Sequence, residues 1–341
     1  MSTIHQYIER SSGEIRNEPL FGDRVVQWLY HPVREKAPQL FKLITGARTT
    51  RMLGFLNYDL ALATRVLGNR RFLEETGIDP GECLDPLRTL DTARKVFERK
   101  IRYWECRPMP EATEAVVSPA DARVIIGSLS DQSQLEIKGK FFSYEELLGT
   151  DKQPWLDTFA DGDFAIFRLT PDKYHYNHVP VAGRVIDVYE LDGCFHSCNP
   201  DAVVSTVTPY SKNRRVVTII DTDVPDGTGV GKVAMLEVVA LMIGEIVQCY
   251  SSVCYDQPKT VWPGMFLSKG CPKSLYRPGS STDVLLFEPG RIRFADDLQA
   301  NRLRQDVLSR FSAGFQRPLV ETDIRVRSLL ATAIPVSGGS R

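Results

Sequence analysis

The stretch Gly279-Ser-Ser-Thr-Asp-Val-Leu-Leu-Phe-Glu-Pro-Gly290 places a turn of small residues directly before a short apolar run, which a Pro-Gly turn closes. Glycine and serine favour turns, and a short apolar run between turns predicts a buried strand. A serine in a tight, strained turn can also attack its own preceding carbonyl and convert the peptide bond into an ester. Elimination of that ester splits the chain and leaves a pyruvoyl group. The pattern alone fits both an ordinary hairpin and a self-cleaving serine.

The chain around this stretch reads as an α+β protein. Short β-rich runs, separated by Gly, Pro, Asp and Asn, occur at 116–117, 122–126, 164–169, 179–189, 216–220 and 284–287. Residues 20–105 instead carry apolar stripes at helical spacing. Separate groups of helices and strands predict an α+β fold rather than a doubly wound sheet. We expect an N-terminal helical region over 1–105 and a mainly antiparallel β catalytic core over 106–341.

Three further segments, one of them at the end of the N-terminal region, also suggest helices. The most apolar window, 233–247, is interrupted by Glu237 and Glu245, so it predicts a buried core helix rather than a transmembrane span. Residues 91–102 carry alternating charge, and residues 297–311 have a helix-like pattern.

Composition narrows the classes of function. The 42 basic and 43 acidic residues give a formal net charge of −1, which offers no general attraction for nucleic acid. The seven cysteines are odd in number and irregularly spaced, and no signal-peptide pattern precedes them. We therefore expect free thiols in a reducing cytoplasm.

Two further segments bear on the serine turn. Residues 117–121 read Val-Ser-Pro-Ala-Asp, and residues 174–180 read Tyr-His-Tyr-Asn-His-Val-Pro. With the Gly-Ser-Ser-Thr turn, and in the same order, they resemble the Ser-Pro-Ala-Asp, Tyr-His-x-x-His-x-Pro and Gly-Ser-Thr motifs of the phosphatidylserine decarboxylase family. Similarity continues at 137–149, 199–200 and 269–270, so the resemblance covers roughly residues 100 to 295.

The resemblance implies a self-cleaving, pyruvoyl-dependent decarboxylase that converts phosphatidylserine into phosphatidylethanolamine. It assigns Asp121 as the acid that orients a histidine, His178 as the base and Ser281 as the nucleophile, in the manner of a Ser-His-Asp triad. His175 corresponds to a second histidine, close to the substrate during decarboxylation. The pyruvoyl group would be the covalent cofactor, so no external one is needed.

The choice between Ser280 and Ser281 rests on spacing. Ser281 precedes Phe287 by the six-residue step of the family and is followed by Thr282. Counting forward from Lys269-Gly270 against the shorter form of the motif selects Ser280 instead. We prefer Ser281, although Ser280 stands where glycine is usual. Two other departures, Ala122 for glycine and Lys173 for aspartate, bear on the substrate and the fine tuning of the site.

The family's lipid substrate implies peripheral association with the inner face of a membrane, and the resemblance also implies a homodimer. Basic amphipathic helices near residues 21–36 suit an anionic surface, but the same stripes also suit packing against the rest of the protein. Two other readings stay open. One is a pyruvoyl-dependent decarboxylase of a free amino acid such as tryptophan. The other is a non-catalytic scaffold whose metal site would draw on His175, His178, Cys194, His196 and Cys198.

Overall fold

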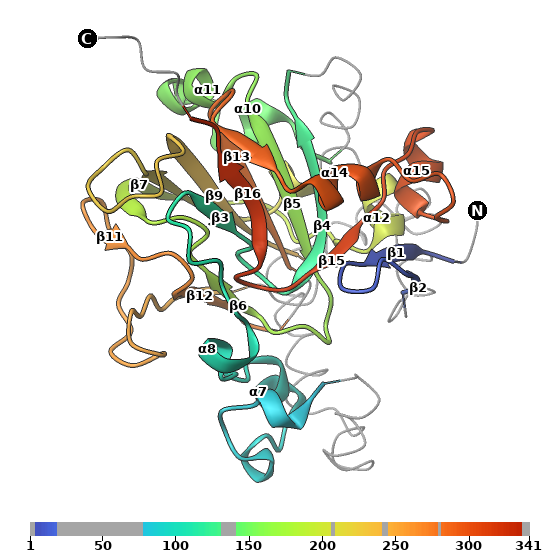
Figure 1. Ribbon diagram of the computed structural model, residues 1–341, viewed down its shortest axis with the longest axis horizontal. Coiled ribbons are helices and arrows are strands. Elements are labelled where there is room, and N and C mark those ends of the chain that lie inside the picture. Colours follow the sequence, from blue (N-terminus) through green and yellow to red (C-terminus); the bar gives the residue numbers. More distant parts are fainter. Residues whose placement is uncertain are drawn as a thin grey trace.

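The computed structural model describes residues 4–18, 78–130, 141–205, 209–240, 245–278 and 281–335. Its centre is a ten-stranded sheet in the order β11-β7-β8-β9-β13-β5-β4-β15-β1-β2, shown in Figure 1. Of the strand pairs between described residues, β1 with β15 is parallel and the others are antiparallel. The expected α+β fold with a mainly antiparallel β core is confirmed.

The large sheet consists of β1 (Gln6–Glu9), β2 (Ile15–Asn17), β4 (Ala122–Ser128), β5 (Asp163–Leu169), β7 (Gly183–Leu191), β8 (Arg215–Asp221), β9 (Lys232–Val239), β11 (Phe266–Leu267), β13 (Ser281–Phe287) and β15 (Thr322–Ile324). One small sheet has β10 (Ile246–Gln248), β12 (Pro272–Tyr276) and β6 (Tyr176–His178). The other has β14 (Ile292–Phe294), β16 (Leu329–Ala333) and β3 (Ala115–Val117).

The described helices are short. They are η3 (Pro80–Glu82), η4 (Leu87–Thr89), α7 (Ala93–Phe97), α8 (Tyr103–Cys106), α10 (Tyr144–Leu148), α11 (Gln153–Phe159), α12 (Pro200–Ser205), α13 (Pro209–Lys212), α14 (Asp296–Arg302) and α15 (Arg310–Phe315). In Figure 1, α7 and α8 lie below the sheets, next to β6 and β12. Ile101 and Tyr103 pack there against Tyr174, Tyr176 and Leu275.

The large sheet is buried on both faces. Along β13, Val284 and Leu286 belong to a core shared with side chains from α10, α11, α12, α13 and α15. Leu285 and Phe287 point the other way, into a core shared with residues of the two small sheets. Alternate residues of a strand point to opposite faces, so a strand covered on both sides reads as a continuous apolar run. This explains why the run after Ser281 lacks polar alternation.

The helix expected over 233–247 is wrong. This window contains β9 (Lys232–Val239) and the start of β10 (Ile246–Gln248). The strand β9 pairs with β8 on one side and β13 on the other, and both of its faces are buried. A fully buried strand and a buried helix look alike by periodicity. The β-branched residues at 233, 238 and 239 are the local signal for the strand.

The helices expected at 91–102 and 297–311 form only in part. The first is limited to α7, and the second is divided between α14 and the start of α15. Of the expected strand 179–189, the part from Gly183 onward belongs to β7. Residues 19–77, which include most of the expected N-terminal stripes, lie outside the described residues. The domain boundary near 105 stays a prediction, although β1 and β2 from the first region extend the core sheet.

Candidate active site

Ser281 is the first residue of β13, at the centre of the large sheet. Its backbone lies between Leu169 of β5 and Val239 of β9. The side chain is 1% exposed, and its Oγ has no hydrogen-bond partner among the residues that the structure describes. Ser280 lies just outside the described residues. A buried hydroxyl without a partner is costly in a folded protein, so this one calls for a functional explanation.

The face of the sheet to which Ser281 belongs also carries Asp283, because residues two apart on a strand share a face. Leu285 and Phe287 continue that face and pack in the same core as Tyr276 of β12. The Tyr276 hydroxyl donates to the Thr282 carbonyl at 3.0 Å, which ties the small sheet to the start of β13. The Ser281 side chain therefore lies on the face of the large sheet that β12 covers.

His178 is fully buried, and both of its ring nitrogens are engaged. Nδ1 lies 2.8 Å from the Gly270 carbonyl, and Nε2 lies 2.9 Å from the Tyr174 hydroxyl. Because a carbonyl can only accept, Nδ1 carries the proton and Nε2 accepts from the tyrosine. Burial lowers the pKa of His178 to about 3. The imidazole is therefore neutral near pH 7, with its lone pair on Nε2, which is the form that a general base requires.

Asp121 is buried against Arg107. The guanidinium donates to Oδ1 at 3.1 Å and to Oδ2 at 2.8 Å, and the Val326 backbone N–H donates to Oδ1 at 2.7 Å. Burial alone would raise the pKa of this carboxyl, but the charge and hydrogen bonds of Arg107 outweigh burial and lower it. The segment of Asp121 also meets His178 directly, since the Pro119 carbonyl accepts the His178 backbone N–H at 2.7 Å.

His175 has a different environment from His178. Its ring stacks on Phe97 with centroids 3.5 Å apart, and neither ring nitrogen makes a hydrogen bond to a side chain in the described part of the chain. Burial, reinforced by the nearby Arg99 charge, lowers the pKa of His175 to about 3. The side-chain hydrogen bonds of Asp121 and His178 likewise go to separate partners and do not join the two residues or reach Ser281. Their catalytic roles stay predictions.

The structure contains a buried polar cluster near Ser281 that the sequence analysis did not predict. Glu237 of β9 lies directly opposite Asp283 of β13, and the Lys273 ammonium of β12 lies 2.7 Å from a Glu237 oxygen. All three side chains are fully buried. In the sequence, Glu237 marks an interruption of an apolar window. Assigning this window to a strand would have placed the Glu237 carboxylate on a buried face. Buried charges are rare without partners, so the strand assignment would have indicated that Glu237 has one.

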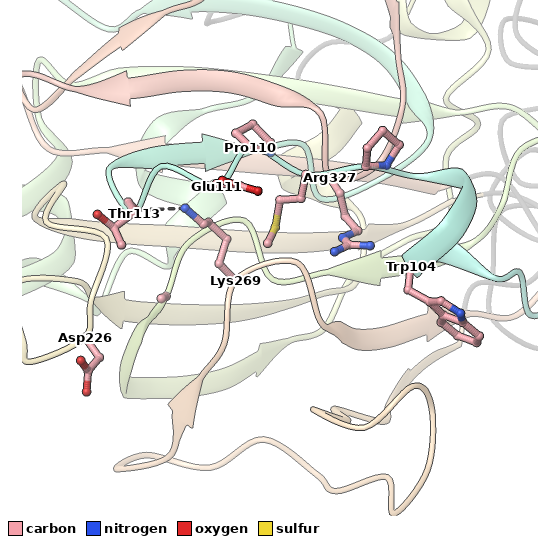
Figure 2. Close-up of a pocket in the computed structure, with 10 residues that line it drawn as sticks. Trp104, Pro110, Glu111, Thr113, Asp226, Lys269 and Arg327 are labelled. Carbon is pink, nitrogen blue, oxygen red and sulfur yellow. Dashed lines mark hydrogen bonds between the residues drawn. The ribbon is translucent and has the colours of Figure 1, made fainter.

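A pocket of about 250 Å³ has Lys269, the chain neighbour of Gly270, in its lining (Figure 2). Trp104, Lys269 and Arg327 are among the residues that line it. The Lys269 ammonium donates to the carbonyls of Ala112, Thr113 and Ala115 at 2.7 to 2.9 Å, so it holds the wall of the pocket together. Gly270 has φ +75°, and a Cβ there would come within 2.4 Å of the sulfur of Met109. The Lys269-Gly270 pair thus fixes the carbonyl that orients His178.

The chain is similar in sequence to known enzymes over most of its length. Residues 93–309 match the family model described as phosphatidylserine decarboxylase. The chain is 30% identical over 293 residues to the phosphatidylserine decarboxylase proenzyme of Chlamydia muridarum, covering 86% of this chain and 90% of that protein. This chain belongs to the phosphatidylserine decarboxylase family. It is therefore an enzyme of the carboxy-lyase class, which releases CO₂ from its substrate.

Two further members of this family show how widely the match extends. Phosphatidylserine decarboxylase proenzyme 2 of Oryza sativa subsp. japonica is 35% identical over 240 residues, which is 69% of this chain and 35% of that protein. The proenzyme of Fusobacterium nucleatum subsp. nucleatum is 26% identical over 297 residues, with 87% and 91% covered.

A candidate metal group lies elsewhere than the sequence suggested. In the described part of the chain, His5, Glu18 and Glu321 bring their ligand atoms within 4.8 Å of one another. The Arg168 guanidinium already lies 2.6 Å from an oxygen of each glutamate, and the Arg310 backbone N–H donates to His5 Nδ1 at 3.1 Å. Arg168 thus supplies the positive charge that a metal would bring. None of the described helices has both the length and the apolar character needed to cross a bilayer.

Proposed function

We propose that this protein decarboxylates phosphatidylserine to phosphatidylethanolamine, with a pyruvoyl group that Ser281 yields when the chain cleaves itself. The observation that carries the proposal is the buried, unpartnered Oγ of Ser281 at the very start of a central strand. The curated relatives are named proenzymes, in keeping with a chain made as a precursor.

The sheet around Ser281 suits a chain break at this position. The strand β13 pairs with β5 and with β9 along its whole length, from Ser281 to Phe287. A small chain that begins at residue 281 would therefore stay bound through two complete ladders of backbone hydrogen bonds. The new end would also remain at the position of Ser281, so cleavage would create the reactive group without dismantling the site.

We infer that the pyruvoyl group takes the place of Ser281 after cleavage. A bound ketone supplies an electron sink for the bond to the departing carboxylate, so no external cofactor is needed. We assign His178 as the base that takes the Ser281 proton, because its neutral imidazole keeps a lone pair on Nε2. In the structure Nε2 accepts from Tyr174, so His178 must exchange that partner before it acts on Ser281.

Asp121 would support His178 through its charge, and the segment that precedes Asp121 holds the His178 backbone. The negative charge of Asp121 acts against the effect of burial on the pKa of His178. The Pro119 carbonyl, two residues before Asp121, holds the His178 backbone. We assign Asp121 and Arg107 as positioning residues for the self-cleavage step. His175 is assigned to the substrate side of the reaction, where its ring nitrogens, which bind no side chain among the described residues, can bind polar groups.

A lipid substrate requires contact with a membrane surface, and we propose that the protein attaches peripherally. The described region contributes exposed apolar side chains that suit an interface, Trp104 at 40% and Val253 at 56% exposure. Their segments adjoin, since the rings of Tyr103 and Tyr255 lie 5.4 Å apart.

We also propose a homodimer, which light scattering of the purified protein tests directly.

The experiment that tests the substrate compares CO₂ release from carboxyl-labelled phosphatidylserine in vesicles with release from free labelled serine and tryptophan. We expect turnover of the lipid and at most traces with the free amino acids. Turnover of a free amino acid with none of the lipid would replace the proposal with a soluble amino-acid decarboxylase. An intact single chain without activity on any of the three would instead support the scaffold.

A further inference from the structure

Two carboxyl groups and one ammonium group are buried together on the Ser281 side of the large sheet. Asp283 and Glu237 are direct partners on β13 and β9, and Lys273 reaches Glu237 from β12. All three are 0% exposed. If both carboxyl groups were ionised, this buried site would hold a net negative charge, which is strongly unfavourable away from water. One cation can balance one carboxylate, so one of the two carboxyl groups has to keep a proton.

Glu237 is the ionised member of the pair. Its carboxylate accepts from Lys273 Nζ at 2.7 Å, from Gln248 Nε2 at 2.9 Å and from Asn177 Nδ2 at 3.3 Å, and also from the Ser274 hydroxyl. Burial alone would raise the pKa of Glu237, but Lys273 outweighs burial and lowers it. Both oxygens are fully used, and every partner is a donor.

Asp283 has the opposite surroundings. Its Oδ1 lies 2.7 Å from the Tyr276 hydroxyl, and its Oδ2 has no partner. The same hydroxyl lies 3.0 Å from the Thr282 carbonyl, which can only accept. A phenol has a single proton, so both contacts are satisfied together when Asp283 donates to Tyr276 and Tyr276 donates to Thr282. Burial and the nearby Glu237 charge act in the same direction and raise the pKa of Asp283 well above its usual range.

We propose that Asp283 is a catalytic residue that holds a proton at neutral pH and delivers it to the carbon from which CO₂ has left. Loss of CO₂ breaks a carbon–carbon bond and leaves its electron pair on the former α carbon. A new C–H bond forms there as the O–H bond of Asp283 breaks, and water then returns a proton to the carboxylate. The inference rests on the proposed function, because it places the reacting carbon at residue 281.

The position of Asp283 suits this role. It lies two residues after Ser281 on the same face, so the two Cα atoms are about 7 Å apart along an extended strand. We infer that a substrate joined at residue 281 would carry its reacting carbon on this same face, toward Asp283. The two histidines are poorer donors, because burial lowers the pKa of both His175 and His178 to about 3 and leaves them neutral near pH 7.

The protonation state is tested first, on protein that does not depend on the pyruvoyl group. Infrared spectra of the uncut Ser281→Ala variant at pH 7 should show the carbonyl stretch of a protonated carboxyl group. Adding Asp283→Asn should remove that band, whereas adding Asp256→Asn, at an exposed aspartate, should leave it unchanged. A spectrum that Asp283→Asn does not alter would refute a protonated Asp283, whatever the outcome of the proposed function.

The catalytic role is tested in the self-cleaved enzyme. Asp283→Asn keeps the shape of the side chain, so we expect normal cleavage by intact mass and a turnover slower by roughly 10²- to 10⁴-fold, the usual contribution of a general acid. Asp283→Glu should recover part of the rate. Wild-type turnover should decline at high pH as the carboxyl group ionises, and the Asn variant should lack this decline. Wild-type turnover by the Asn variant, or an Asn variant that stays uncut, would overturn the assignment.

Discussion

The carboxylate of Asp121 and the guanidinium of Arg107 form a buried ion pair in which Nε and Nη2 of one arginine both contact one aspartate. The same guanidinium donates to both Glu82 oxygens at 2.7 and 2.8 Å. Arg107 therefore connects the helix η3, which ends at Glu82, to the aspartate of the Ser-Pro-Ala-Asp motif. This contact makes Arg107 part of the machinery that holds Asp121 ionised.

Replacing Arg107 with Ala should destabilise the protein, because it leaves the buried Asp121 charge without its cation. We expect a loss of about 3–5 kcal/mol, the usual result of removing one partner of a buried pair. Urea unfolding of the uncut Ser281→Ala background measures the loss. The matched control is Arg293→Ala, whose exposed pair with Asp296 should contribute little. Equal losses in the two variants would contradict a special role for the buried pair.

Self-cleavage should occur at Ser281. Intact mass of the wild-type protein should show a large chain that ends at Ser280 and a small chain that begins with a pyruvoyl group and lacks a free amine. Ser281→Ala should remain a single chain, because it removes the attacking hydroxyl. Ser280→Ala should still cleave and serves as the matched control. If only Ser280→Ala blocks cleavage, the pyruvoyl group comes from Ser280 instead.

The two histidines should differ in effect. His178→Ala should leave the chain uncut, since a serine hydroxyl needs a positioned base near neutral pH. His175→Ala should cleave normally but turn over more slowly, because it removes ring nitrogens that we assign to the substrate side of the reaction. Gel analysis of cleavage and a CO₂ assay separate the two steps. Identical behaviour of the two variants would show that our division of roles is wrong.

Stability should fall as the solution is acidified below pH 6.5. Burial lowers the pKa of His175 and His178 from 6.5 to about 3 in the folded protein. Between pH 3 and pH 6.5 the unfolded chain therefore binds more protons at these histidines than the folded one. Asp283 acts in the opposite direction, because its raised pKa lets the folded state keep a proton that the unfolded chain loses. Near pH 5 we expect these three groups together to contribute a slope of about one proton, on the order of 1.4 kcal/mol per pH unit.

Removing Asp283 should make that fall steeper. In Ser281→Ala/Asp283→Asn the opposing contribution is gone, so the slope near pH 5 should exceed that of Ser281→Ala by about 1.4 kcal/mol per pH unit. Urea unfolding at pH 6 and pH 5 gives both slopes. Unchanged slopes in the two proteins would count against a proton held by Asp283 in the folded state.

Membrane attachment should depend on the basic N-terminal segment. Arg24, Arg34 and Lys36 flank an apolar stripe in the sequence and lie outside the described residues. Each basic residue close to an anionic bilayer contributes roughly 1 kcal/mol, so charge reversal at all three should release the protein from phosphatidylserine vesicles. Vesicle sedimentation should show binding that weakens with salt. A wild-type protein that stays in the supernatant at low salt would argue against a peripheral membrane enzyme.

The local pattern was a good guide where one signal dominated. Apolar and β-branched runs between turn residues correctly predicted strands at β4, β5, β8 and β13. The local pattern gave the wrong element at 233–247, because strand β9 is covered on both faces and so shows no alternation of apolar and polar residues. The short motifs in their order were enough to indicate the family, which the comparison then showed.

Contacts between residues far apart in the chain could be found only in the folded structure. The sequence by itself determined which residue types carry the chemistry, with Asp121, His175, His178 and Ser281 each in a recognisable motif. Only the tertiary structure placed Arg107 on Asp121 and Glu237 opposite Asp283. The physical reason is that a charge acts through distance and burial, and both are set by how strands β9, β12 and β13 pair, which short motifs do not encode.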